Sequence, residues 1–175
     1  LLQRSIRTVD YHTGGEPFRI VTGGIPELEG RSVLERRRWA QDHLDDIRRL
    51  LVNEPRGHAD MYGAFVTPPN DDWADLGVVF FHNEGYSTAC GHGTIALVTW
   101  AVETGRIGRG PDDREVTVTV DVPSGRLACT ARLDDDGLVE AVRFRNVPSF
   151  VLARDVTVRV DDRLLTLDIA FGGAF

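Results

Sequence analysis

Residues 86–94 read Tyr-Ser-Thr-Ala-Cys-Gly-His-Gly-Thr, and they run into an apolar segment, residues 95–104, that ends at Gly105. The apolar segment is hydrophobic on nearly every side, which predicts a helix buried at the centre of a fold. Cys90 precedes this helix, and two poor helix formers, Gly91 and Gly93, occupy its opening turn. Glycines at these positions indicate that a ligand approaches the bare backbone closely.

The N-terminus of the predicted helix is a candidate anion site. The first N–H groups of a helix have no partners within it and point beyond the helix end. The same positive end is expected to lower the pKa of the Cys90 thiol and to raise its thiolate fraction. We therefore interpret Cys90 as a base or a nucleophile. The amides beside it, those of Gly91, His92 and Gly93, would seat a substrate carboxylate.

A second motif overlaps this stretch. Residues 91–96 match the dinucleotide-binding fingerprint in the form that ends in Ala. In that fingerprint a strand runs directly into the first glycine. Here the expected strand 76–81 ends well before Gly91, and the later strands are hairpin-like. The sequence therefore disfavours a nicotinamide cofactor.

The other cysteine and the histidines have simpler interpretations. Cys129 lies on the apolar face of an alternating segment and is interpreted as a core residue. His58 and His82 lie in polar loops, where we expect turn structure and local hydrogen bonding. His92 is either a buried, hydrogen-bonded histidine or a group that holds a polar part of the substrate. No His, Cys or carboxylate pair has the tight spacing of a zinc site, so no metal is predicted.

Composition narrows the functional classes. With 175 residues, 42% of them hydrophobic, the chain is long enough for one domain with a real core. A net charge of −7 argues against binding to nucleic acid or to an anionic membrane. We find no stretch with the length of a transmembrane helix and expect no signal peptide. Two cysteines make no disulfide framework and favour a reducing, cytoplasmic setting.

All 20 basic residues are Arg, so no Lys is present in this chain. This composition excludes a pyridoxal Schiff base and a phosphate-loop lysine within the chain. Amino-acid chemistry here would proceed without pyridoxal phosphate, and no cofactor is expected.

The rest of the pattern predicts strands with two helices. Ser32 and Glu35 have the spacing of a capping box, which starts an amphipathic helix whose apolar stripe continues to Leu51. Alternation and turn residues predict short strands on both sides of the apolar helix. The expected strands are 6–11, 17–22, 62–67, 76–81, 116–120, 127–131, 138–145, 156–160 and 164–169.

Three blocks are separated along the chain. They read Tyr-His-Thr-Gly-Gly-Glu-Pro-Phe-Arg-Ile-Val at 11–21, Glu-Pro-Arg-Gly-His-Ala-Asp-Met-Tyr-Gly at 54–63 and Cys-Gly-His-Gly-Thr-Ile-Ala at 90–96. Together they resemble the proline racemase family. The family comprises proline racemases, 4-hydroxyproline 2-epimerases and trans-3-hydroxy-L-proline dehydratases. The resemblance implies a diaminopimelate-epimerase-like fold of the α+β class: two lobes, each a curved antiparallel sheet around a buried central helix. It also implies that Cys90 is one catalytic acid/base and that Gly91 and His92 contribute to substrate binding.

The resemblance bears on the subgroup and on domain organisation. Residues 82–88, with residues 61–63, look most similar to the dehydratase branch, whereas Ala89 departs from the Met of many members. The second lobe carries an opposing Cys in racemases and epimerases, or a Thr or Ser in dehydratases. We expect residues 1–170 to form the N-terminal catalytic lobe and residues 171–175 to start the crossover to a second lobe absent from this chain. A homodimer is expected at full length.

The expected function is cofactor-independent α-proton abstraction from a cyclic imino acid, proline or hydroxyproline, with Cys90 as base. The favoured reaction is dehydration of trans-3-hydroxy-L-proline to Δ1-pyrroline-2-carboxylate, for which one catalytic thiol can suffice. The alternative is a proline racemase or 4-hydroxyproline 2-epimerase, which needs a second acid on the opposite face. Alternatives of other classes are a cysteine hydrolase, which needs a paired His, and a non-catalytic imino-acid-binding module.

Overall fold

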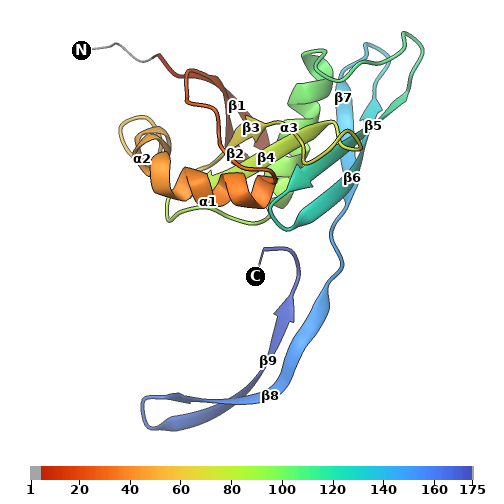
Figure 1. Ribbon diagram of the computed structural model, residues 1–175. Coiled ribbons are helices and arrows are strands. Elements are labelled where there is room, and N and C mark those ends of the chain that lie inside the picture. The colour runs from red at the N-terminus through yellow and green to blue at the C-terminus, as the bar shows by residue number, and fades with distance from the viewer. Residues whose placement is uncertain (1–4, 175) are drawn as a thin grey trace.

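A seven-stranded sheet with helices on both faces makes up most of the computed structural model, which describes residues 5–174 (Figure 1). The sheet strands are β1 (Arg7–Thr13), β2 (Glu16–Gly23), β3 (Tyr62–Thr67), β4 (Leu76–His82), β5 (Glu115–Val122), β6 (Gly125–Leu133) and β7 (Val139–Arg145). The helices are α1 (Val33–His43), α2 (Asp45–Val52) and α3 (Gly91–Glu103), and a hairpin follows from β8 (Phe150–Val160) and β9 (Arg163–Phe171). All the expected strands are present, and so is the helix behind Cys90.

Strand order in the sheet follows chain order from β1 to β7. Four of the neighbouring pairs are antiparallel, but β2–β3 and β4–β5 are parallel. Parallel neighbours need a crossover connection, which α1 and α2 supply for the first pair and α3 for the second. Because β2 and β4 run in opposite directions, right-handed crossovers put their helices on opposite faces of the sheet. The expected α+β fold with a curved sheet is therefore confirmed. The sheet is mixed, because it contains two parallel pairs that the sequence did not indicate.

Two hydrophobic cores follow from this arrangement. Val78 and Phe80 of β4 face α3, whereas Val79 and Phe81 face α1 and α2. Since side chains alternate between the faces of a strand, a strand covered on both sides is apolar throughout. The β4 sequence, Leu-Gly-Val-Val-Phe-Phe-His, has this character, and only its last residue is more than slightly exposed.

The apolar helix α3 is the centre of the larger core. Eight of its residues are buried, among them Leu97, Val98 and Ala101 without measurable exposure. The prediction of a buried central helix is confirmed. Truncation of a buried Leu such as Leu97 typically costs about 2–5 kcal/mol of folding stability, so the position of this helix is firmly fixed.

The amphipathic helix predicted to run from Val33 to Leu51 is interrupted. Ser32 caps α1 by accepting a hydrogen bond from the Glu35 amide at 3.2 Å, as the capping box predicts. At Leu44 the backbone leaves helical geometry, with φ −123° and ψ 12°, and α2 begins at Asp45. Acidic residues favour a helix N-terminus, and the pair Asp45–Asp46 supports this new start. The sequence did not show the break, because the apolar stripe continues across it.

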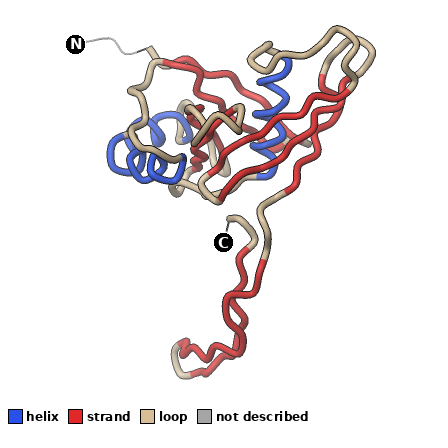
Figure 2. The backbone as a smooth tube through the Cα atoms, turned by 45° about the vertical axis from the view of Figure 1, so that its right-hand side comes forward, coloured by secondary structure: helices blue, strands red, loops and turns tan. Residues whose placement is uncertain are grey.

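The hairpin β8–β9 makes a two-stranded sheet of its own and projects from the rest of the protein (Figure 2). Directly paired residues share one face, and the pairs Val156–Leu167 and Val158–Leu165 make that face apolar. Leu165 is 45% exposed and Leu167 38% exposed. The expected division at residue 170 stays a prediction, and residues 1–4 and 175 lie outside the described part of the chain.

Candidate active site

Cys90 is the N-cap residue of α3 and is almost buried, with 8% of its surface exposed. Gly93 lies directly beside it. A Cβ atom at Gly93 would come within 2.3 Å of the Phe18 ring and 2.9 Å of Cys90 Sγ. A Cβ atom at Gly91 would meet only Phe144, at 3.8 Å. Core packing therefore requires glycine at position 93. The sequence indicated open backbone for a ligand at both glycines, but the structure leaves it open only at Gly91.

The expected depression of the Cys90 pKa is not found. Burial raises the pKa of the Cys90 thiol to about 12. The Gly93 N–H acts in the opposite direction, although it makes no full cap hydrogen bond, and the Glu16 carboxylate adds to the increase. Desolvation outweighs the positive helix end because the sulfur lies inside the core. At neutral pH the thiol of this chain is protonated.

His92 lies against the thiol. Its Nδ1 and Nε2 atoms are 3.6 and 3.8 Å from Cys90 Sγ. The His92 carbonyl accepts a hydrogen bond from Thr13 Oγ1 at 3.0 Å, and its ring meets Tyr62 edge-on at a centroid distance of 5.0 Å. Burial lowers the pKa of His92, with partial compensation from Glu16. The ring is therefore neutral at neutral pH and a weaker base than a free imidazole.

A hollow of about 220 Å³ opens beside Cys90. Its wall includes Gly91, Phe144 and Asn146, and the segment Gly172–Ala174 lies along it. Thr88 Oγ1 donates to the carbonyls of Gly173 and Ala174, at 2.8 and 3.1 Å. This volume lies below the usual range for drug-sized ligands, about 300–1,000 Å³, and is suited to a small molecule.

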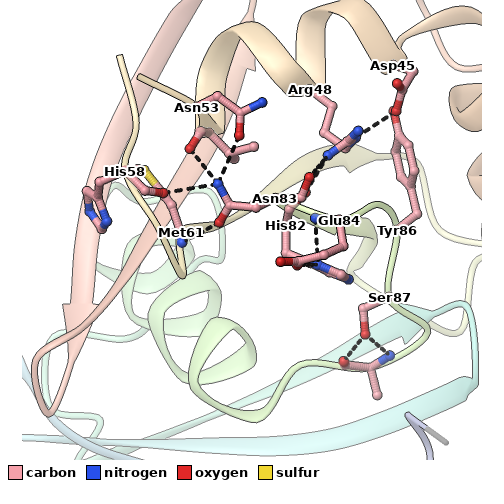
Figure 3. A network of polar contacts seen from close by, with 12 residues as sticks. Asp45, Arg48, Asn53, His58, Met61, His82, Asn83, Glu84, Tyr86 and Ser87 are labelled. Atoms are coloured by element: carbon pink, nitrogen blue, oxygen red, sulfur yellow. Dashed lines mark hydrogen bonds and ion pairs between the residues drawn. The ribbon is translucent and has the colours of Figure 1, made fainter. Parts of the chain in front are cut away.

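The three sequence blocks meet around this site. Thr13 of the first block holds His92 of the third. Arg19 Nη1 of the first block donates to the Arg56 carbonyl of the second, at 2.6 Å. Asn83 Nδ2 donates to the His58 carbonyl of the second block, at 3.0 Å, and links it to the loop before Cys90 (Figure 3). Blocks that are far apart in sequence thus form one supported site.

The interpretations of Cys129, His58 and His82 agree with the structure. Cys129 is fully buried in β6. His58 Nδ1 contacts the Ala59 carbonyl at 2.7 Å, and His82 Nδ1 contacts Glu84 Oε2 at 2.8 Å, so both serve local structure. Within residues 5–174 no three His, Cys, Asp or Glu side chains gather at a distance suited to a metal ion.

Two contributors to the site were not singled out from the sequence. Tyr62 packs on His92, and Phe144 of β7 faces Gly91. Tyr62 belongs to the second block, so its position there was a usable signal. Phe144 lies in an ordinary alternating strand, and only the tertiary fold brings it to the helix end.

Comparison with known proteins decides the family. The family model described as proline racemase matches residues 8–175. The chain belongs to the proline racemase family. It is 51% identical over 175 residues to a 3-hydroxyproline 2-epimerase of Burkholderia multivorans, covering 99% of the chain and 51% of the relative. It is 48% identical over 168 residues to a trans-3-hydroxy-L-proline dehydratase of Bacillus cereus, covering 96% of the chain and 49% of the relative.

A solved structure of the same family shares the fold. The hydroxyproline epimerase of Agrobacterium vitis, with bound trans-4-hydroxy-L-proline, matches with a TM-score of 0.85 and 26% identity. The match covers 98% of this chain and 50% of that one. The chain therefore spans about half the length of the curated relatives and of the solved structure that it matches.

Proposed function

We propose that a full-length protein containing this chain dehydrates trans-3-hydroxy-L-proline to Δ1-pyrroline-2-carboxylate, with Cys90 as the base. The observation that carries the proposal is the position of Cys90 Sγ at the N-terminus of α3. The sulfur lies beside a small hollow and 3.6 Å from the His92 ring. A base and fixed backbone dipoles at one point are what removal of a proton next to a carboxylate requires.

The names of the relatives support 3-hydroxyproline as the substrate. The dehydratases of Bacillus cereus and Burkholderia cenocepacia and the epimerase of Burkholderia multivorans are 48–51% identical to this chain, and all three are named for 3-hydroxyproline. The structure with bound 4-hydroxyproline is only 26% identical. Identity does not separate dehydratase from epimerase, because both names occur at 51%. The preference for dehydration rests on the resemblance of residues 82–88 to the dehydratase branch.

The reaction can be written with the residues of this chain. The amides of Gly91, His92 and Gly93 surround the helix end, where they would hold the substrate carboxylate as negative charge builds on it. Cys90 must first lose its proton, and the neutral His92 ring is close enough to accept it. The raised pKa of the thiol and the lowered pKa of His92 both oppose this transfer, so we propose that substrate binding and closure of the site in the full-length protein favour it. The thiolate then takes the Cα proton and is a thiol again. The protonated His92 ring would return its proton to the C3 hydroxyl, which leaves as water. The resulting enamine tautomerises to Δ1-pyrroline-2-carboxylate without any cofactor.

The domain organisation belongs to the same proposal. Residues 1–170 would form one catalytic lobe, and residues 171–175 would start the crossover to a second lobe that closes the site. The apolar face of β8–β9 supports this arrangement, because an isolated two-stranded hairpin is marginally stable in water. A homodimer in the cytoplasm is proposed for the full-length protein. No helix among residues 5–174 is long and apolar enough to cross a membrane.

Exchange of the substrate α-proton with deuterium from solvent tests the proposal. The full-length protein and its Cys90→Ser and Cys129→Ser variants are incubated with trans-3-hydroxy-L-proline, trans-4-hydroxy-L-proline and L-proline. We expect exchange and a ketimine product from the first substrate, loss of both in Cys90→Ser, and retention in Cys129→Ser. Normal exchange in folded Cys90→Ser would remove Cys90 from the mechanism.

A second candidate is 3-hydroxyproline 2-epimerisation, which the 51% identical relative of Burkholderia multivorans favours. In that case the same incubation gives the inverted imino acid and no ketimine. The close Cys90–His92 pair also fits a cysteine hydrolase. Trapping of a covalent acyl adduct on Cys90 would support that alternative. Binding of hydroxyproline without exchange would indicate a non-catalytic module.

A further inference from the structure

The loop between β4 and α3, residues 83–89, is held in place by α2. Arg48 of α2 is buried, with 5% of its surface exposed. Its Nη1 donates to the carbonyls of His82 and Asn83 at 2.7 and 2.6 Å, and its Nε donates to Asp45 Oδ1 at 2.7 Å (Figure 3). The guanidinium also faces the Tyr86 ring, 5.9 Å from its centre. A buried cation is tolerated only with such partners. All the partners of Arg48 named here except Asp45 lie in the loop or at the end of β4 that leads into it.

Asn83 fixes the same loop from a second side. Its Oδ1 accepts from the Met61 amide at 2.8 Å. Its Nδ2 donates to the carbonyl of Val52 at 2.8 Å and to that of His58 at 3.0 Å. Acceptor and donor groups of the amide are thus all used. The loop, the C-terminal end of α2 and the second sequence block form one connected support (Figure 3).

Packed rings connect this support to the thiol. The His82 ring lies against Tyr62 at a centroid distance of 5.1 Å. Tyr62 meets the His92 ring at 5.0 Å, and His92 Nδ1 is 3.6 Å from Cys90 Sγ. The backbone that Arg48 holds is therefore two ring contacts away from the residues at the reacting position.

We propose that Arg48 is a positioning residue: through the carbonyls of His82 and Asn83 it sets the His82–Tyr62–His92 contacts and thereby the placement of Cys90. This inference adds a positioning residue to the proposed function. Only its kinetic test, the measurement of kcat and KM, rests on that function. It assigns α2, on the face of the sheet opposite α3, a part in organising the active site.

Arg36 offers a matched control. It lies on α1 and its Nη1 donates to the carbonyls of Pro68 and Pro69 and to Thr67 Oγ1. These residues lie at the C-terminal end of β3, at the end of the β3–β4 pair opposite the loop that leads to Cys90. Arg36→Gln therefore removes a similar set of bonds between an arginine and a loop without touching the support described above.

The experiment compares Arg48→Gln, Arg48→Lys and Arg36→Gln in the full-length protein. Alkylation of Cys90 by iodoacetamide is followed on its peptide by mass spectrometry, alongside thermal unfolding and kcat and KM for trans-3-hydroxy-L-proline. We expect Arg48→Gln to alkylate at least about threefold faster, because a loosened loop exposes the sulfur. Its kcat should fall by about tenfold or more, with a smaller change in KM, because misplaced reacting groups are costly.

Arg48→Lys keeps the charge but not the forked geometry, so its values should lie between those of the parent and of Arg48→Gln. Arg36→Gln should lower the unfolding temperature without changing Cys90 alkylation. The proposal would be overturned if a folded Arg48 variant, Arg48→Gln or Arg48→Lys, had the same Cys90 alkylation rate and the same kcat as Arg36→Gln. Alkylation needs no substrate, so a protein inactive on 3-hydroxyproline would refute the proposed function and still test the role of Arg48. If Arg48→Gln does not fold, the comparison of Arg48→Lys with Arg36→Gln tests whether Arg48 positions Cys90.

Discussion

Gly91 and Gly93 lie two residues apart at the start of α3, yet their surroundings are opposite. Gly93 is buried between the Phe18 ring and Cys90 Sγ, and Phe18 is itself completely buried. Gly91 is exposed at the mouth of the hollow. The same residue type therefore serves packing at one position and access at the other.

A pair of substitutions separates these roles. Gly93→Ala should destabilise the fold by about 1–3 kcal/mol, since overpacking a rigid aromatic neighbour forces the backbone to move. Gly91→Ala should leave stability nearly unchanged, because its Cβ finds room and Ala is the better helix former. Urea unfolding of the two variants measures the difference. Equal midpoints would contradict the packing assigned to Gly93.

The buried thiols predict a loss of stability in alkaline solution. Burial raises the pKa of both Cys90 and Cys129 from an ordinary value of 9.0 to about 12. Between these values the unfolded chain releases protons that the folded chain retains, so the free energy of unfolding falls as pH rises from 9 to 12. Below pH 9 this contribution to stability is fully present. The chain contains no Lys to titrate in this window, although buried Tyr86, whose pKa is also raised, acts in the same direction.

Cys129→Ala tests this prediction. The variant removes one of the two thiols, so its free energy of unfolding should fall less steeply between pH 9 and 12 than that of the unaltered chain. Urea titrations at half-unit pH steps provide both curves. Parallel curves for the two proteins would show that Cys129 does not carry a raised pKa.

At this scale the sequence pointed to residues that lie side by side in the structure, but it did not give the protonation state of the thiol. Cys90 and His92 were singled out from residue pattern and resemblance, and the structure brings them within 3.6 Å of each other. The thiol pKa depends on how deeply Phe18 and the sheet bury the sulfur. Burial is a tertiary property that the local motif does not encode, so the helix-end argument alone gave the wrong direction.

Among the elements, the hairpin β8–β9 differs most from the others. Its apolar face, which includes Phe150, Val158, Leu165 and Leu167, lacks cover from any described element of the sheet body. Exposed apolar strands promote association between chains.

Polar substitutions on this face should therefore change association. The 175-residue chain should form dimers or larger species in sedimentation velocity experiments. Leu165→Arg with Leu167→Arg should shift it toward the monomer and leave thermal unfolding of the sheet body within a few degrees. Thr157→Arg and Thr166→Arg, a pair on the other face, serve as the control. Equal sedimentation of both double variants would indicate that another surface mediates association.

Most elements could be predicted from sequence because alternation and apolar stripes are local signals. Tyr62–Thr67 was expected with its observed bounds. The parallel pairings β2–β3 and β4–β5 were not, since pairing direction depends on whether the connection brings the chain back to the end of the sheet where the preceding strand began. The interruption at Leu44 was also missed, because an apolar stripe constrains the buried face of a helix and not its continuity.

For the whole molecule, the central question is whether one lobe suffices for turnover. The hollow beside Cys90 is formed by this chain, but efficient proton abstraction needs a site from which water is excluded. We expect the 175-residue chain to show negligible α-proton exchange, whereas a full-length protein containing it is active. Exchange in deuterium oxide at equal protein concentration compares the two. Full activity of the monomeric 175-residue chain would place the complete site within it.

The strand order β1 to β7 also bears on how the protein folds during synthesis. Each strand joins the sheet next to the one made immediately before it, so no strand has to wait for a distant neighbour in order to pair. Contacts between elements close in sequence are associated with fast folding, and domains commonly fold as the chain emerges from the ribosome. The sheet can therefore grow from one edge while translation continues. Arrested nascent chains that expose residues through β4, α3 and β6 in turn should gain protease resistance in steps, rather than all at once after β7.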